Sequence, residues 1–78
     1  MKKYEPLYTY LKICKNNVIT LSYSELEGII SDKLPASAYK HRPWWGNGSH
    51  IQSESWLTAN YKVTNVVLGD KVTFEKII

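Results

Sequence analysis

The chain has 78 residues, of which 44% are hydrophobic and 22% are charged, which excludes outright disorder and allows one domain over residues 1–78. Cys14 is the only cysteine, which excludes an internal disulfide and favours a cytoplasmic setting, and no apolar run has the ~20 residues of a membrane span, so we expect no membrane partner. The formal net charge is +3, and its placement along the chain is more informative than its size.

The first elements expected are a helix and a short strand. Pro6 suits the first position of a helix, and Leu7, Leu11 and Cys14 follow it at helical spacing. Cys14 is therefore expected to be a packing thiol, and the two asparagines at 16–17 to end the helix. The β-branched run that follows predicts a strand over residues 18–21.

A second helix should begin at a capping box formed by Ser22 and Glu25, because serine accepts a hydrogen bond from the first turn and glutamate returns one. Residues 32–35 should end this helix. Its inner face is expected to hold Leu26, Ile29 and Ile30.

The middle of the chain carries the charge. Residues 33–62 hold four basic residues and one acidic residue, whereas the rest of the chain carries six of each. Both histidines and all three tryptophans lie in the same segment. Residues 36–42 predict two helical turns that Pro43 ends, and residues 44–48 predict a bend with two glycine hinges.

A further helix is expected after this bend. Ser49 and Gln52 have capping-box spacing, which predicts a helix of about ten residues reaching Asn60. Trp56 lies in the middle of that helix and is expected in the core.

The C-terminal part predicts a β-hairpin, because residues 61–68 and 71–77 are rich in strand-forming residues and flank Gly69-Asp70, a two-residue loop. A loop of that length pairs Val67 with Val72, Asn65 with Phe74, and Val63 with Lys76. The face turned to the core would then hold Val63, Val67, Val72 and Phe74.

These elements predict an α+β domain, because a lone hairpin is marginal and the short early strand is its obvious third partner. We expect three or four short helices packed on a two- to three-stranded antiparallel sheet with a C-terminal β-hairpin. The order matches the winged-helix variant of the helix-turn-helix domains, in which a helix enters the major groove and the hairpin flanks it. Whether residues 36–42 or 50–60 would be that helix is left open by the sequence.

Nothing in the sequence predicts catalysis. There is no nucleophile elbow and no phosphate loop, and His41 and His50 have no cysteine or carboxylate at zinc-site spacing. We therefore expect no enzyme activity, no metal and no cofactor. A catalytic hypothesis would have to begin with one of the two histidines.

The basic, tryptophan-containing stretch around residues 40–45 is the expected binding site. Two adjacent indoles on a bend diverge, so one of Trp44 and Trp45 should be in the core and the other partly exposed beside Arg42. The alternatives are a solvated positive surface and a purely structural cation–π pair between Arg42 and an indole. The candidate nucleic-acid-binding residues are Lys40, His41, Arg42, Trp44, Trp45, Asn47, Gln52 and Lys62.

The segment from Ser37 to Asn47, followed by Trp56-Leu57 and Tyr61 to Val63, resembles an uncharacterised family of small bacterial domains that share a His-Arg-x-Trp-Trp-x-Asn pattern. Residues 4–8 and 26–35 also fit, so the likeness covers most of the chain. The resemblance implies no particular activity. If the pattern marks a ligand surface, its positions in this sequence are His41, Arg42, Trp44, Trp45 and Asn47.

The leading hypothesis is a non-catalytic nucleic-acid-binding domain, with DNA favoured as the partner. Lys40, Arg42 and Lys62 would contact phosphates, since cations neutralise the nucleic-acid backbone, and Asn47 and Gln52 would contact bases or phosphates. The alternative is a protein-binding inhibitor or adaptor of a mobile element or phage that acts on a host defence protein, because exposed Trp and Arg dominate interface hot spots. The small core leaves homodimerisation open.

Overall fold

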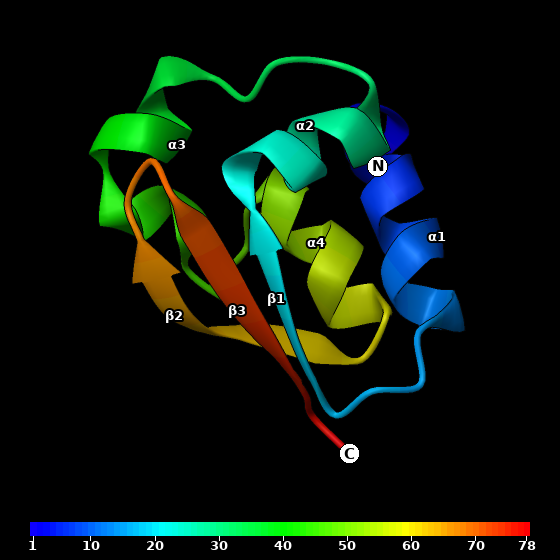
Figure 1. Ribbon diagram of the computed structural model, residues 1–78. Helices are drawn as coiled ribbons and strands as arrows, with labels where there is room; N and C mark the ends of the chain where they lie inside the picture. The colour runs from blue at the N-terminus through cyan, green and yellow to red at the C-terminus, as the bar shows by residue number, and fades with distance from the viewer.

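Four α-helices pack on a three-stranded antiparallel sheet in the computed structural model, which describes residues 1–78 (Figure 1). In chain order the elements are the 3₁₀ helix η1 (Lys2–Tyr4), α1 (Glu5–Ile13), β1 (Val18–Ser22), α2 (Tyr23–Ile30), α3 (Ala36–Lys40), the 3₁₀ helix η2 (Arg42–Trp45), α4 (Ile51–Thr58), β2 (Tyr61–Val67) and β3 (Lys71–Lys76). The strand order is β1-β3-β2, so the early strand pairs with the last one. The predicted α+β class, the third strand and the C-terminal hairpin are confirmed.

The first helix forms as predicted, with one difference at its end. Pro6 lies in its first turn, and Leu7 and Leu11 are buried. The helix stops at Ile13, and Cys14 adopts an extended backbone with φ −72° and ψ 141°. Cys14 is therefore half-exposed, and the prediction of a core thiol at the end of the helical stripe was wrong.

The capping box at the start of α2 is confirmed. The backbone N–H of Glu25 donates to Ser22 Oγ at 3.0 Å, and the backbone N–H of Ser22 donates to Glu25 Oε1 at 2.9 Å. Leu26 and Ile30 are buried on the inner face, where α2 packs on α1. Local hydrogen bonding and apolar spacing together fix where this helix begins and which face it buries.

Two boundaries in the middle of the chain differ from the prediction. The helix expected over 36–42 ends at Lys40, and His41 is extended with φ −125° and ψ 109°. Pro43 lies inside η2, where its fixed φ suits the start of a 3₁₀ turn, and it does not end a helix.

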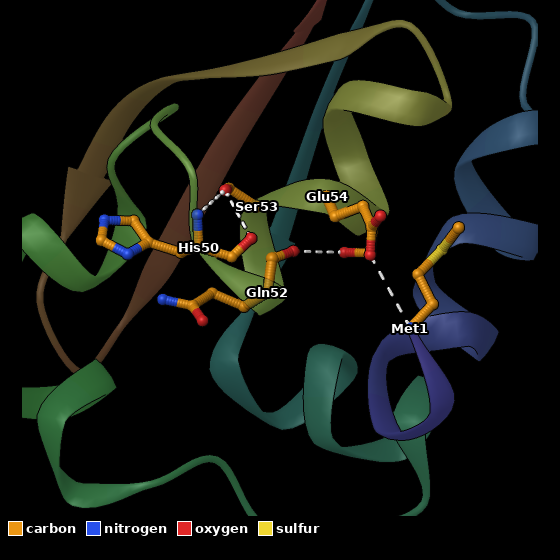
Figure 2. A network of polar contacts seen from close by, with 6 residues as sticks. Met1, His50, Gln52, Ser53 and Glu54 are labelled. Carbon is orange, nitrogen blue, oxygen red and sulfur yellow. Dashed lines mark hydrogen bonds and ion pairs between the residues drawn. The ribbon is translucent and has the colours of Figure 1, made fainter.

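The start of α4 lies one residue later than its predicted capping box, so the box of Ser49 and Gln52 was wrong. Ser53 Oγ accepts from the backbone N–H of His50 at 3.1 Å, which leaves the side chain of Gln52 free for another contact. Figure 2 shows this hydrogen bond and the imidazole of His50 directed away from the helix.

The hairpin has a different loop and register from those predicted. Its loop has three residues, 68–70, and the N–H of Asp70 donates to the Val67 carbonyl across Gly69, whose φ is +78°. The register shifts between Val63 and Asn65, which marks a β-bulge. The observed pairs are Val67 with Lys71, Val66 with Val72, Asn65 with Thr73, Val63 with Phe74, and Tyr61 with Lys76.

The bulge and the longer loop change which residues face the core, because successive strand residues point to opposite faces. Val72 and Phe74 are fully buried as predicted, but Val67 is 39% exposed and Val66 takes the half-buried position instead. Tyr61, whose burial was not predicted, is also fully buried. The core lies between the inner face of the sheet and the helices, and none of the helices has the length and apolar character needed to cross a bilayer.

Candidate nucleic-acid interface

Trp45 is the anchor that fixes η2 to the body of the domain. Its side chain is 2% exposed, and its indole N–H donates to both the Ala38 carbonyl and the Tyr23 hydroxyl at 2.9 Å. The Tyr23 hydroxyl in turn donates to the same Ala38 carbonyl at 2.7 Å. The indole also stacks on Trp56 with a centroid distance of 5.9 Å. Trp45 therefore holds α3 and η2 against the core and is almost entirely covered.

Asn47 is engaged in the same way, at the outer edge of β2. Its side-chain amide donates to the Val63 carbonyl and its Oδ1 accepts from the Val63 N–H, both at 2.9 Å. The same Oδ1 accepts from the indole N–H of the fully buried Trp56, also at 2.9 Å. This one side chain thus fastens the loop after η2 to the sheet and satisfies a buried donor.

Trp44 and Gln52 support the turn from its other side. Trp44 is half-buried, lies at an edge-on angle to the ring of Tyr4 at 6.0 Å, and is 4.6 Å from Trp45 between ring centroids. The side-chain amide of Gln52 donates to the Trp44 carbonyl at 2.9 Å. The prediction that one indole is buried and the other partly exposed is confirmed, with Trp45 as the buried one.

Lys40, His41 and Arg42 form a different group, because all three side chains are exposed. The ion pairs of the chain join Met1 to Glu54 and Lys3 to Asp32, and its side-chain hydrogen bonds use none of these three residues. The cation–π contacts of the chain involve Lys3, Lys12 and Lys76, so the structural pair of Arg42 with an indole is absent.

Lys62 is exposed on the outer face of the sheet, where it lies opposite Glu75 of β3. It comes from β2, the strand against which η2 packs. Lys40, His41 and Arg42 lie at the end of α3 and the start of η2, and Figure 1 shows α3 beside the tip of the β2–β3 hairpin. The structure therefore brings Lys40, His41 and Arg42 together beside the hairpin, whereas Lys62 lies near the other end of β2, away from the hairpin tip.

An open depression of about 380 Å³ separates η2 from the edge of β2. Arg42 is its only charged residue, and no acidic side chain lines it. The residues that surround it are Arg42, Trp45, Gly46, Asn47, Val63, Thr64, Asn65 and Val66.

A clip between α2 and α3 positions the start of this region. The Tyr39 hydroxyl donates to Glu27 Oε2 at 2.7 Å, and the Leu34 N–H donates to the same oxygen at 2.9 Å. These two hydrogen bonds hold the pKa of Glu27 below its usual value of 4.5, and the Glu27 carboxylate raises the pKa of Tyr39 above 10.0. Tyr39 also lies at the hairpin tip, since a Cβ on Gly69 would be 3.9 Å from its ring.

The second histidine lies apart from this surface. His50 borders a separate hollow of about 460 Å³ at the start of α4, together with Ile51 and Glu54. Glu54 is directed the other way, toward the amino group of Met1 at 3.7 Å (Figure 2). No group of three or more His, Cys, Asp or Glu side chains is placed to hold a metal ion.

Comparison with protein-family models gives a match over residues 4–78 to a family described as a domain of unknown function, DUF7662. The chain belongs to this family. The DUF7662 match begins at Tyr4, which contacts Trp44, and runs through all four α-helices and the whole sheet. No curated protein and no solved structure matches the chain.

The sequence pattern missed the part of this candidate site that β2 provides. Thr64, Asn65 and Val66 face the same depression as Arg42, yet none of them was a candidate. The bulge at Thr64 sets the register of these residues, and bulges have no composition signal in a single sequence. The sequence also did not predict that one side of β2 has no neighbouring strand, because only the strand order shows that β2 is an edge strand.

Proposed function

We propose that this domain binds nucleic acid, with DNA favoured, through the α3–η2 turn and the adjoining β2–β3 hairpin. The observation that carries the proposal is the run Lys40-His41-Arg42, whose side chains are exposed and make no ion pair with the rest of the chain, and whose last residue, Arg42, borders an open depression without acidic residues. A single-sign, unpaired surface of this kind attracts phosphates, because the cations release the counterions condensed on the nucleic acid.

The roles within the site are unequal. Lys40, Arg42 and Lys62 are the phosphate contacts, and the half-buried Trp44, two residues after Arg42, offers an indole for stacking. Trp45, Asn47 and Gln52 act as supports, because their polar atoms already bond within the domain. The helix, strand, helix, helix, hairpin order and the β1-β3-β2 sheet support a winged-helix-like arrangement with the hairpin as its wing.

The test is a salt titration of the purified domain against labelled duplex and single-stranded DNA, followed by fluorescence anisotropy. If three to four phosphates are neutralised on duplex, the slope of log K against log[salt] should be about −3 to −4. Changing both Lys40 and Arg42 to alanine should reduce that slope by about 2, since each lost phosphate contact removes about 0.9.

The matched control removes the same charge elsewhere. Lys12 and Lys15 are exposed lysines outside the 33–62 segment, so changing both to alanine should leave the slope largely unchanged. Absence of binding to any nucleic acid at low salt would refute the proposal, as would an equal loss of affinity in both double variants.

A protein-binding adaptor or inhibitor, of the kind a mobile element or phage directs at a host defence protein, is the second candidate. The observation in its favour is the half-exposed Trp44 two residues from the exposed Arg42, since these residue types dominate interface hot spots. Trp44→Ala separates the two functions when duplex DNA is the nucleic-acid probe, because paired bases are not free to stack on the indole: a protein complex should weaken by about 2 kcal/mol or more, whereas the salt slope of binding to duplex DNA should be unchanged. A nuclease-resistant, stoichiometric protein partner in a pull-down would favour this candidate.

A further inference from the structure

The outer edge of β2 carries a hydrogen-bonding pair that the domain does not use. The backbone N–H and C=O of Val63 bond to Asn47, so they point away from β3. Phe74 lies opposite Val63 on β3, and its backbone N–H and C=O must therefore point toward β1. Val72 is two residues before Phe74 on the same strand and therefore bonds on the same side. It follows that Val66, which lies opposite Val72, directs its N–H and C=O outward.

This pair opens into the depression beside η2. Val66 is one of the residues that line that depression, and no turn, loop or side-chain hydrogen bond of the chain involves its backbone. The bulge at Thr64 lies between the edge position that Asn47 occupies and the one at Val66 that stays free. The depression thus contains an adjacent donor and acceptor on a rigid strand.

Asn47 shows what kind of group fits such a pair. Its planar carboxamide sets one acceptor and one donor side by side and makes two bonds of 2.9 Å to Val63. The Watson–Crick edge of every nucleobase also sets an acceptor next to a donor, as N1 and the N6 amine do in adenine. In a duplex these groups are already paired, so only an unpaired base can present them to a protein.

The rim of the depression suits a nucleotide as well. Arg42 lies on it, and a guanidinium can contact the phosphate or lie over the plane of the base. The side chains of Thr64 and Asn65 add further polar groups, and no carboxylate is present to repel a phosphate.

The helices argue against insertion into a duplex groove. A recognition helix places several side chains on base edges and usually carries cations that hold the DNA backbone. The exposed side chains of α4 include Glu54 and no lysine or arginine, and α3 has only five residues. Lys40 and Arg42 lie on the α3–η2 turn, and Arg42 borders the depression.

Resting on the proposed function, we propose that the preferred ligand is single-stranded nucleic acid, with one unpaired base bound in the depression between η2 and β2 through the backbone of Val66 and with Arg42 on its phosphate or ring. Binding depends on the base being accessible and tolerates any of the bases, because each one presents the required donor and acceptor. The cationic turn holds the flanking phosphates.

Val66→Pro tests the backbone contact, because proline removes the N–H and an edge strand tolerates proline where that N–H faces outward. Val66→Ala is the matched control, since it shortens the same side chain and keeps the N–H. We expect Val66→Pro to bind a mixed-sequence single strand about 2–10-fold more weakly than Val66→Ala does, which is the contribution of one hydrogen bond. The salt slope and the affinity for the corresponding duplex should be equal in the two variants.

A second measurement needs no variant and so does not depend on the folding of the proline protein. Single strands in which the bases are replaced by abasic sites should bind the unmodified protein no better than duplex does, with an unchanged salt slope. Equal affinity for intact strand, abasic strand and duplex would overturn this inference and leave the proposed function standing. Failure to bind any of the three would overturn both.

Discussion

The residues on either side of Trp44 lie in one short stretch of sequence but have opposite environments. Before it, Lys40, His41 and Arg42 are exposed and make no ion pair. After it, Trp45 and Asn47 use their polar atoms in five hydrogen bonds to the rest of the domain. A contiguous motif of this kind therefore combines a surface with the support that holds the surface in place.

The difference arises from the contacts of each side chain. In a 3₁₀ helix residues three positions apart lie on the same face, so the helix period alone does not separate Arg42 from Trp45. Trp45 is buried because its indole N–H bonds to Ala38 and Tyr23 in the core, whereas no hydrogen bond or ion pair holds the side chain of Arg42. The hydrogen bonds of Trp45 and Asn47 fix the turn that carries the exposed cations. This favours binding, because side chains on a fixed turn lose less conformational entropy on binding a ligand than those on a mobile loop. The two sides make separate predictions, one set for stability and one for binding.

The largest effect on stability should come from Trp45→Ala. Removing a buried tryptophan leaves a cavity and typically destabilises a protein by about 3–5 kcal/mol, a large part of the total for a domain of this size. Trp44→Ala should destabilise it less, because that indole is only half-buried. Urea unfolding followed by circular dichroism measures both, and equal losses would contradict the division into support and surface.

Asn47→Ala should have the next largest effect, about 1–3 kcal/mol, because it leaves the indole N–H of buried Trp56 without an acceptor. Asn65→Ala is the matched control. Asn65 borders the same depression as Asn47, but it is exposed and its side chain makes no hydrogen bond within the domain. The control should change the free energy of unfolding by no more than about 0.5 kcal/mol. Asn47 would lose its assigned role if the two variants were equally stable.

A smaller, pH-dependent effect is expected at the clip between Glu27 and Tyr39. The pKa of Glu27 is lowered in the folded state by the Tyr39 hydroxyl and the Leu34 N–H, so its contribution is present above the usual value of 4.5 and is lost as the pH falls through the lower folded value. Glu27→Gln keeps an acceptor oxygen and does not titrate. The difference in Tm between the two proteins should therefore shrink as the pH falls below 4.5, and a constant difference would exclude this linkage.

The sequence alone was sufficient for the elements that depend on local signals. Apolar spacing and the Ser22–Glu25 capping box located α1 and α2, and the strand at Val18 was correctly joined to the hairpin. The divergence of Trp44 and Trp45 also followed from their adjacency. These features depend on residues within a few positions of one another, which is why one sequence can reveal them.

The rest depends on pairings between distant residues. The amide of Asn47 bonds to Val63, sixteen residues away, and nothing near Asn47 in the sequence distinguishes this role from that of a ligand contact. The three-residue loop moved the partner of Val72 from Val67 to Val66, which exchanged these two residues on the inner face, and the bulge after Val63 moved the partner of Phe74 one residue further, to Val63. The outward direction of the Val66 N–H and C=O follows from that register, and the free edge of β2 from the strand order, so the part of the site that this strand provides could not be predicted.

The smallest stability change, and the sharpest separation of the two sides, is expected for the double variant Lys40→Ala and Arg42→Ala. Neither side chain is buried or bonded, so the free energy of unfolding should change by no more than about 0.5 kcal/mol, while the affinity for DNA falls. Urea unfolding and the salt titration on the same preparation give both values. A marked loss of stability would assign the two cations to the support of the turn, and the binding defect would then reflect a displaced η2 instead of lost phosphate contacts.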